Sequence, residues 1–156
     1  MKNEIIIVLG MHRSGTSALT GSLSRLGFEF GDNLQGAMAN VNEKGFFEDN
    51  DVVALNERIL ITIGRSWASL APIKETEFLN PLVEELLVEA VLLVEKKMVK
   101  FSRLALKDPR LCVLMPFWVR VFAQLHIAPK ILVAVRNPVS VVDSLVKRDS
   151  FEREKA

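Results

Sequence analysis

Eight residues near the N-terminus have the spacing of a phosphate-binding loop. The segment from Gly10 to Ser17 reads GMHRSGTS, in which two glycines are separated by four residues and followed by two hydroxyl side chains. Glycines let the backbone curl so that successive N–H groups point at one anion, and a helix that begins there adds unpaired N–H donors. We therefore expect an anion site in which Ser14, Thr16 and Ser17 supply further donors.

The loop departs from the nucleoside-triphosphatase pattern at one position. Where that pattern has Gly-Lys-Ser/Thr, this chain reads Gly15-Thr16-Ser17, so the lysine that reaches the β- and γ-phosphates is absent. Arg13 supplies a cation inside the loop instead, and its planar guanidinium suits two oxyanion oxygens. Its neighbour His12 is a further candidate contact or base, or else a side chain that points away. The pattern favours a monophosphate-like cradle over triphosphate hydrolysis.

A second anion site is predicted after the apolar run Lys130–Val135. Arg136 follows this run directly, at the carboxyl end of a predicted strand, where open α/β sheets bind their ligands. Ser140 and Ser144 are four residues apart and so face one side of the helix that follows. Arg136 and Ser144 can therefore converge on one phosphate; the alternative is an arginine paired with a carboxylate and serines that are simply solvated.

Apolar runs and capping residues define the elements that position these sites. The β-branched run Glu4–Leu9 and the run Lys130–Val135 are typical of strands buried on both faces, and Leu104–Leu106 is a shorter apolar run between them. Gly27 has the place of a helix C-cap, and an Asn-Pro pair that suits an N-cap and first turn occurs twice. Helices are predicted after the glycine loop, over roughly 50–62, from Asn80-Pro81 to about Lys100, around Pro116–Leu125, and from Asn137-Pro138 to about Arg148. This alternation predicts an α/β domain with a parallel sheet.

Composition restricts the class of protein. The chain has 156 residues, 49% of them hydrophobic, which suits one domain with a core. Twenty Lys and Arg against 19 Asp and Glu argue against a general nucleic-acid binder, so any anion site must be local. The lone Cys112 excludes an internal disulfide and a Cys-rich zinc module, and its apolar setting predicts a small buried side chain.

No apolar run reaches the ~18–20 residues of a membrane span. The run Ile5–Leu9 is also too short for the apolar part of a signal peptide. We therefore expect a cytoplasmic protein without membrane or nucleic-acid partners.

Three motifs together resemble the PAPS-dependent sulfotransferases, where PAPS is 3′-phosphoadenosine-5′-phosphosulfate. GMHRSGTSAL is similar to the 5′-phosphosulfate loop of that family, in which Lys or Arg precedes Ser-Gly-Thr. VAVRNPVSVVDS places Arg136 and Ser144 at the spacing of the family's 3′-phosphate site. LALKDPR resembles the Lys-Asp-Pro segment of protein-tyrosine sulfotransferases, and NEKGFFED resembles bacterial members. The matches span residues 4–148 in the expected order.

The resemblance implies a fold, a co-substrate and a reaction. It implies a single three-layer α/β/α domain over residues 1–156, of the P-loop-containing nucleotide hydrolase-like type. It also implies transfer of a sulfuryl group from PAPS to a hydroxyl of a glycan or small metabolite, with release of adenosine 3′,5′-bisphosphate (PAP). No metal is required, because a sulfuryl group carries less charge than a phosphoryl group. The implied PAPS-binding residues are His12, Arg13, Ser14, Gly15, Thr16, Ser17, Arg136 and Ser144.

The implied reaction needs cations at the leaving oxygen and a base for the acceptor. Arg13 and Lys107 are the candidate cations, and Glu48 is the first candidate base. Its rivals as the base are Glu43, Asp49 and His12. Phe46 and Phe47 either wall the acceptor pocket or pack in the core.

Two other functions stay open. Asp108 could hold Lys107 or the glycine loop, or could bind magnesium through water as an imperfect Walker B residue, which would suit a small-molecule kinase with a deviant P-loop. A nucleotide-binding module without catalysis is the non-enzyme alternative.

Sulfotransferases of this type usually continue beyond the 3′-phosphate helix. We therefore expect a domain that is incomplete at its C-terminus, or a reduced form that compensates by association. Either form should leave a sheet edge or an apolar surface uncovered, through which copies of the chain could associate.

Overall fold

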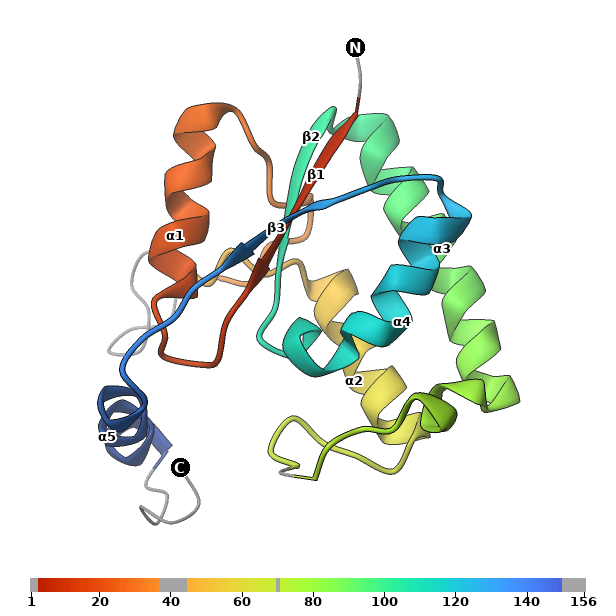
Figure 1. Cartoon of the computed structure of the whole chain (residues 1–156). Coiled ribbons are helices and arrows are strands. Elements are labelled where there is room, and N and C mark those ends of the chain that lie inside the picture. Colours follow the sequence, from red (N-terminus) through yellow and green to blue (C-terminus); the bar gives the residue numbers. More distant parts are fainter. Residues whose placement is uncertain (1–2, 37–44, 70, 150–156) are drawn as a thin grey trace.

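The computed structural model describes residues 3–36, 45–69 and 71–149, and these form an α/β protein with a three-stranded parallel sheet and five α-helices (Figure 1). Two short 3-10 helices complete the described elements. In chain order the elements are β1 (Glu4–Leu9), α1 (Thr16–Leu23), η1 (Ser24–Leu26), α2 (Asn50–Thr62), η2 (Glu75–Leu79), α3 (Pro81–Lys100), β2 (Arg103–Lys107), α4 (Leu111–Gln124), β3 (Lys130–Val133) and α5 (Pro138–Asp149).

The sheet brings the carboxyl ends of its three strands to one edge. Its order is β2-β1-β3, and all pairs are parallel, with Val8 opposite both Lys107 and Leu132. The glycine loop follows β1, the Lys-Asp-Pro-Arg segment follows β2, and Arg136 follows β3. Parallel pairing therefore places all three predicted functional segments side by side.

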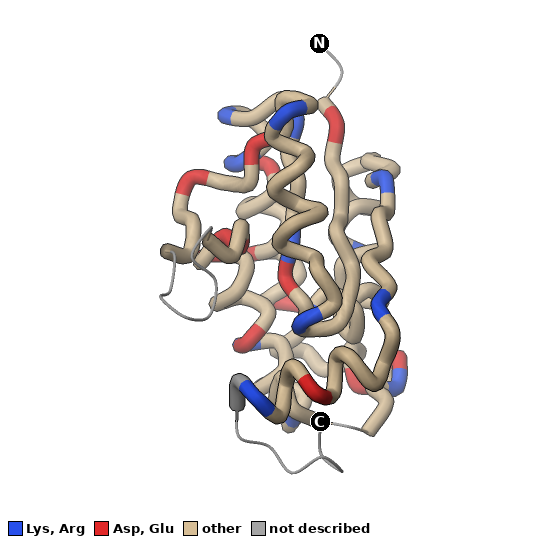
Figure 2. Tube along the Cα trace, turned by 90° about the vertical axis from the view of Figure 1, so that its left-hand side faces the viewer, with Lys and Arg blue, Asp and Glu red and all other residues tan. Residues whose placement is uncertain are grey.

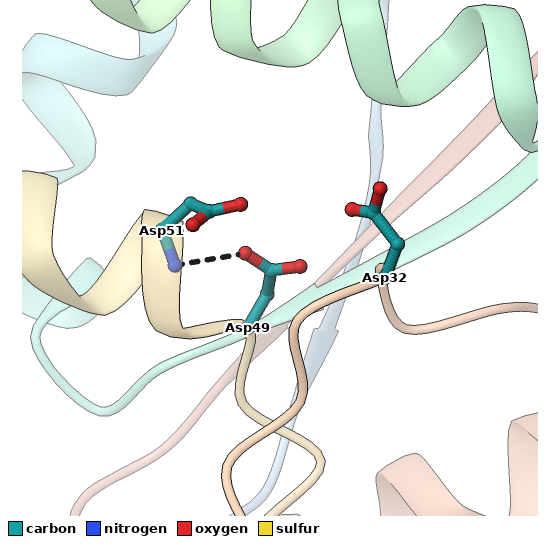
Figure 3. A group of neighbouring side chains, drawn as sticks. All are labelled: Asp32, Asp49 and Asp51. Atoms are coloured by element: carbon teal, nitrogen blue, oxygen red, sulfur yellow. Dashed lines mark hydrogen bonds between the residues drawn. The ribbon is translucent and has the colours of Figure 1, made fainter.

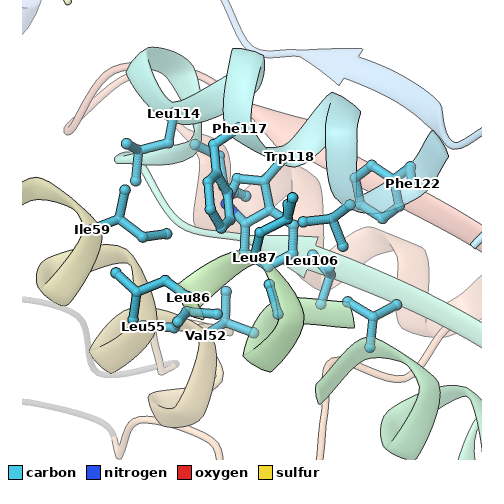
Figure 4. Packing of buried hydrophobic residues seen from close by; sticks show 14 of the residues in the cluster. Val52, Leu55, Ile59, Leu86, Leu87, Leu106, Leu114, Phe117, Trp118 and Phe122 are labelled. Carbon is cyan, nitrogen blue, oxygen red and sulfur yellow. The ribbon is translucent and has the colours of Figure 1, made fainter. Parts of the chain in front are cut away.

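Alternate side chains of β1 enter two separate cores. Ile5 and Ile7 pack with residues of α2, α3 and α4, whereas Ile6 and Val8 pack with Leu23 of α1 and with the aromatic residues that follow it. Because successive strand residues point to opposite faces, helices cover both sides of this strand. Figure 4 shows the larger core, in which Trp118 and Phe117 of α4 lie over the facing leucines of α2 and α3.

Capping residues define the helices as the sequence predicts. Asn80 Oδ1 accepts the N–H of Leu82, with Pro81 in the first turn of α3. Asn137 Oδ1 accepts the N–H of Val139 at the start of α5. Gly27 has φ 77° in the left-handed region, which confirms its place at the end of η1.

The structure corrects the predicted start of one helix. Helix α4 begins at Leu111 and contains Pro116 in its interior, although a proline cannot donate the usual backbone hydrogen bond. The turn before the proline buries Leu111 and Leu114 completely, and this burial outweighs the cost of the proline. Proline therefore marked the interior of this helix and not its start.

Two predictions of burial were wrong. Strand β3 ends at Val133, and the side chain of Val133 is 62% exposed, because β3 is an edge strand that pairs only with β1 among the described residues. Cys112 is exposed at the start of α4, and its Sγ accepts the N–H of Gly10 at 3.1 Å. The exposed β3 edge fits the expected uncovered edge, while association through it stays a prediction. No helix in the described ranges is long and apolar enough to cross a membrane.

Candidate anion-binding site

The glycine loop is curled tightly between β1 and α1. A side chain at Gly10 would bring its Cβ within 2.9 Å of the Ala134 carbonyl oxygen and closer still to Thr16 and Ser14, so no larger residue fits there. Gly15, directly before α1, has φ 92°, and Arg13 also lies in the left-handed region, with φ 65°. The positive φ of Arg13 is unusual for a residue with a side chain and marks a strained position in the loop.

The two predicted anion segments meet at Arg13. Its Nε donates to Ser144 Oγ at 2.8 Å, and Arg136 donates from one guanidinium nitrogen to the Arg13 carbonyl oxygen at 2.9 Å. The loop after β1 is thereby joined to the end of β3 and to α5. Arg13, Arg136 and Ser144 thus share one location in the fold, as a common nucleotide site requires.

A cavity of about 940 Å³ opens beside this junction. Its lining contains five Lys and Arg but one carboxylate, that of Glu48. Figure 2 shows that basic and acidic residues are otherwise spread over the whole trace, which agrees with a net charge of +1. The positive charge is therefore a local property of the cavity. The lining comprises His12, Arg13, Gly15, Thr16, Ser17, Ala18, Gly21, Ser22, Ser24, Arg25, Gln35, Phe46, Phe47, Glu48, Val53, Lys107, Pro109, Arg110 and Arg136.

Lys107 and Glu48 form a buried ion pair at the wall of the cavity. Lys107 is 4% exposed and Glu48 is 6% exposed. The Lys107 ammonium also donates to the Phe46 carbonyl at 3.0 Å and to Ser17 Oγ at 3.3 Å, which links the pair to the glycine loop. Burial raises the pKa of the Glu48 carboxyl, and the charge of Lys107 offsets part of that effect. Two predicted catalytic residues that are far apart in the sequence therefore lie in contact.

Asp108 has a different role from those predicted for it. Its fully buried carboxylate accepts Asn56 Nδ2 at 2.9 Å and both the backbone N–H and the guanidinium of Arg110, at 3.0 and 2.9 Å. Among the described residues, no hydrogen bond or ion pair joins its carboxylate to the Lys107 ammonium or to the glycine loop. Asp108 also does not line the cavity. Asp108 holds Arg110 in place. Arg110 lines the cavity but was not among the predicted site residues, although it belongs to the quoted segment LALKDPR.

Other predicted residues fall into three groups. Ser14 donates its hydroxyl to the Met11 carbonyl at 2.6 Å, so it stabilises the loop from within. His12 lines the cavity with its ring 5.4 Å from that of Trp67, in an edge-to-face arrangement. Phe46 and Phe47 also line the cavity, and Phe47 packs in addition against Phe30 in the smaller core.

Of the rival bases to Glu48, Asp49 is placed less favourably, whereas His12 lines the same cavity. Asp49 is buried away from the cavity lining, where it caps α2 by accepting the N–H of Asp51 at 3.0 Å. Its other oxygen pairs with Lys97 at 2.6 Å. Glu43 lies outside the described residues, so its place as a rival base stays a prediction. Among the described carboxylates, Glu48 alone lines the cavity.

Three carboxylates, drawn in Figure 3, bond the Lys97 ammonium. The side chains of Asp32, Asp49 and Asp51 point toward one another, and their oxygens lie within 4.8 Å of each other. Lys97 Nζ, 2% exposed, bonds all three at 2.9, 2.6 and 3.0 Å. Burial disfavours the charged ammonium, yet the three carboxylates raise its pKa above the ordinary value. The Lys97 ammonium therefore occupies the position in which the three carboxylates alone could hold a metal ion.

The sequence contains a signal for this Lys97 cluster, formed by Lys97 with Asp32, Asp49 and Asp51, that the sequence predictions above do not include. Val83, Leu87, Ala90 and Val94 form the buried stripe of α3, and Lys97 continues their spacing of three and four residues. A charged residue on a buried stripe predicts a buried partner of opposite charge.

Comparison with known proteins found no matching family model, no significant match among curated proteins and none among solved structures. A functional assignment therefore depends on the quoted motifs and on the geometry of the cavity.

Proposed function

We propose that this domain belongs to the PAPS-dependent sulfotransferases, with their three-layer, P-loop-containing nucleotide hydrolase-like fold. It transfers a sulfuryl group from PAPS to a hydroxyl of an acceptor. The single observation that carries the proposal is the junction at Arg13, where Ser144 and Arg136 bond the glycine loop beside a positively charged cavity. A nucleotide with phosphates at its 5′ and 3′ positions needs two anion sites within one cavity, and Arg13 and Arg136, the predicted cations of those two sites, both line this cavity.

The cavity residues account for each part of the reaction. The acceptor oxygen attacks sulfur, a new O–S bond forms, and the bond from sulfur to the 5′-phosphate oxygen of PAPS breaks. The acceptor proton passes to the Glu48 carboxylate, and the products are a sulfate ester and PAP. Lys107 and Arg13 stabilise the negative charge that develops on the leaving oxygen. Since burial raises the pKa of Glu48, its carboxylate is a stronger base than an exposed one.

The environment of Asp108 favours sulfuryl transfer over the kinase alternative. A Walker B carboxylate must present an oxygen to magnesium or to its water shell. Both oxygens of Asp108 are engaged by Asn56 and Arg110 inside the protein, and the loop lacks the P-loop lysine. The P-loop lysine is therefore absent, and the carboxylate that could hold magnesium is already bonded by an amide and a guanidinium.

A thermal-shift comparison tests the proposed function directly. PAP, ATP and AMP are each added with and without magnesium, and PAP is expected to give the largest rise in melting temperature in metal-free buffer. Ser144→Ala and Arg136→Ala should reduce that rise. A larger, magnesium-dependent rise with ATP would overturn the proposal in favour of a kinase. PAP stabilisation without transfer of labelled sulfate from PAPS to any acceptor pool would favour the non-catalytic module.

A further inference from the structure

The cavity continues well beyond the residues proposed to bind the nucleotide. From Ser17 it follows one side of α1, past Ala18 and Gly21, to Arg25 in η1. Arg25 is eight positions after Ser17, which corresponds to roughly 12 Å along a helix. This part of the cavity starts next to Lys107 and Glu48 and leads away from Arg13. It is therefore the part available to the acceptor.

Arg25 is the cation at the far end of this part. The other cavity cations are engaged within the protein: Arg13 with Ser144, Lys107 with Glu48, and Arg110 with Asp108 and Glu57. Arg136 donates to a backbone carbonyl. Arg25 is exposed and has no hydrogen-bond or ion-pair partner among the described residues. A guanidinium that borders a cavity without a partner is ready to bind an anionic group of a ligand.

The walls between these two ends combine polar and aromatic side chains. Ser22 and Ser24 lie on the α1 and η1 side, while Gln35 and Phe47 also line the cavity. The two serine hydroxyls donate to carbonyls of their own helix, which leaves their oxygens able to accept hydrogen bonds. Hydroxyl and amide groups beside an aromatic ring suit a sugar, whose rings have polar edges and apolar faces.

We propose that the acceptor is an acidic oligosaccharide, whose carboxylate or sulfate ester binds Arg25 while one of its hydroxyls reaches Glu48. This inference rests on the proposed function, because Glu48 is the base of that reaction. The Ser17 hydroxyl contacts Lys107, and Arg25 lies roughly 12 Å further along the helix, which exceeds the length of one sugar ring and favours an acceptor with at least two rings. A neutral sugar would leave the positive charge of Arg25 unused.

Calorimetric titration with matched saccharides tests this inference. The probes are a hyaluronan tetrasaccharide, the same tetrasaccharide with its carboxylates reduced to hydroxymethyl groups, and a chondroitin sulfate tetrasaccharide, each with and without PAP. We expect the wild-type protein to bind an acidic probe at least about tenfold more tightly than the reduced one. Arg25→Ala should weaken acidic binding about 10- to 100-fold and leave the reduced probe unaffected. The two acidic probes distinguish a carboxylate from a sulfate ester.

Lys96→Ala is the matched control, because it removes one positive charge from an exposed site on α3, a helix without cavity residues. Equal affinity for the acidic and reduced probes would overturn the inference. So would unchanged affinity in Arg25→Ala, which would leave Arg25 only its favourable position at a helix end. Equally tight binding of a tetraglutamate peptide would overturn the sugar assignment.

The same titrations separate this inference from the proposed function. If PAP binds but the acidic preference is absent, the inference fails and the proposed function stands. If PAP does not bind while acidic probes bind through Arg25, the proposed function fails and the anionic-saccharide site stands.

Discussion

Two buried lysines of this domain contact carboxylates, but the two differ in the number of carboxylates and in their surroundings. Lys107 is 4% exposed and pairs with one carboxylate, that of Glu48, beside a serine hydroxyl and a backbone carbonyl. Lys97 is 2% exposed and pairs with the three carboxylates of the Lys97 cluster. The Lys107–Glu48 pair borders the cavity, whereas Lys97 and its partners do not line it.

The ratio of lysines to carboxylates distinguishes the pair that we propose to react from the cluster that stabilises the fold. In the Lys97 cluster, hydrogen bonds from Lys100 and Lys97 lower the pKa of Asp32, so its carboxylate stays charged. In the Lys107–Glu48 pair, burial raises the pKa of Glu48 despite its lysine. The Asp32 carboxylate therefore resists protonation, whereas the Glu48 carboxylate accepts a proton more readily than an exposed one.

The largest expected effect is on the rate of sulfuryl transfer and concerns the Lys107–Glu48 pair. Glu48→Gln should slow sulfuryl transfer about 10²- to 10⁴-fold, because the amide cannot accept the acceptor proton, and should spare PAP binding. Single-turnover transfer and PAP calorimetry measure the two quantities. Glu89→Gln, an exposed change on α3, is the control. Full transfer in Glu48→Gln would move the base to His12 or Glu43.

Substitutions in the Lys97 cluster should change the free energy of unfolding. Lys97→Met removes the only cation bonded to buried Asp49 among the described residues, and leaving that charge uncompensated should cost about 3–5 kcal/mol of unfolding free energy. Urea denaturation measures the change. Lys100→Met removes only an exposed partner of Asp32 and should cost less than about 1 kcal/mol. Equal effects of the two changes would show that the Lys97 cluster does not differ from a surface ion pair.

A smaller effect is expected at the junction of the two anion segments. Arg13→Ala removes the contact to Ser144 and the guanidinium proposed to bind the nucleotide, so PAP affinity should fall by about 1.5–3 kcal/mol. Calorimetry checks this, with Arg58→Ala as a control on an exposed ion pair outside the cavity. Unchanged affinity would mean that Arg13 only braces α5.

The smallest expected effect is a pH dependence of stability that differs between Asp32 and Glu48. The lowered pKa of Asp32 contributes stability above its ordinary value of 3.8, and that contribution is lost as pH falls through the folded-state pKa. The raised pKa of Glu48 contributes stability below its ordinary value of 4.5, lost as pH rises through the folded-state pKa. Urea midpoints from pH 3 to 8 should therefore show a decline above pH 4.5 that Glu48→Gln removes, and an acid decline that Lys100→Met weakens. If Glu48→Gln left the slope above pH 4.5 unchanged, its carboxyl would titrate normally.

Local patterns were sufficient for most of the fold. The β-branched run of β1, the glycine loop and the caps at Asn80 and Asn137 depend on neighbours within a few residues, so the sequence alone predicts them. Burial of β3 was predicted wrongly, because a strand's apolar run does not reveal whether a second neighbour covers it.

The candidate site was only partly predictable for a similar reason. Motif spacing located Arg13, Lys107 and Arg136, since each lies at the end of a strand or within four residues after it. The lack of a partner for Arg25 among the described residues and the use of Asp108 to hold Arg110 depend on residues that no motif connects.

Which segments curl, cap and alternate can be predicted from the chain, because those features follow from the chemistry of adjacent residues. That Glu48 contacts Lys107 while the adjacent Asp49 contacts Lys97 is visible only in the folded molecule. Ionic contacts between distant residues depend on how helices pack across the sheet, and no local pattern contains that information. Two neighbouring carboxylates that look equivalent in the chain were thereby separated into a cavity wall and a buried brace.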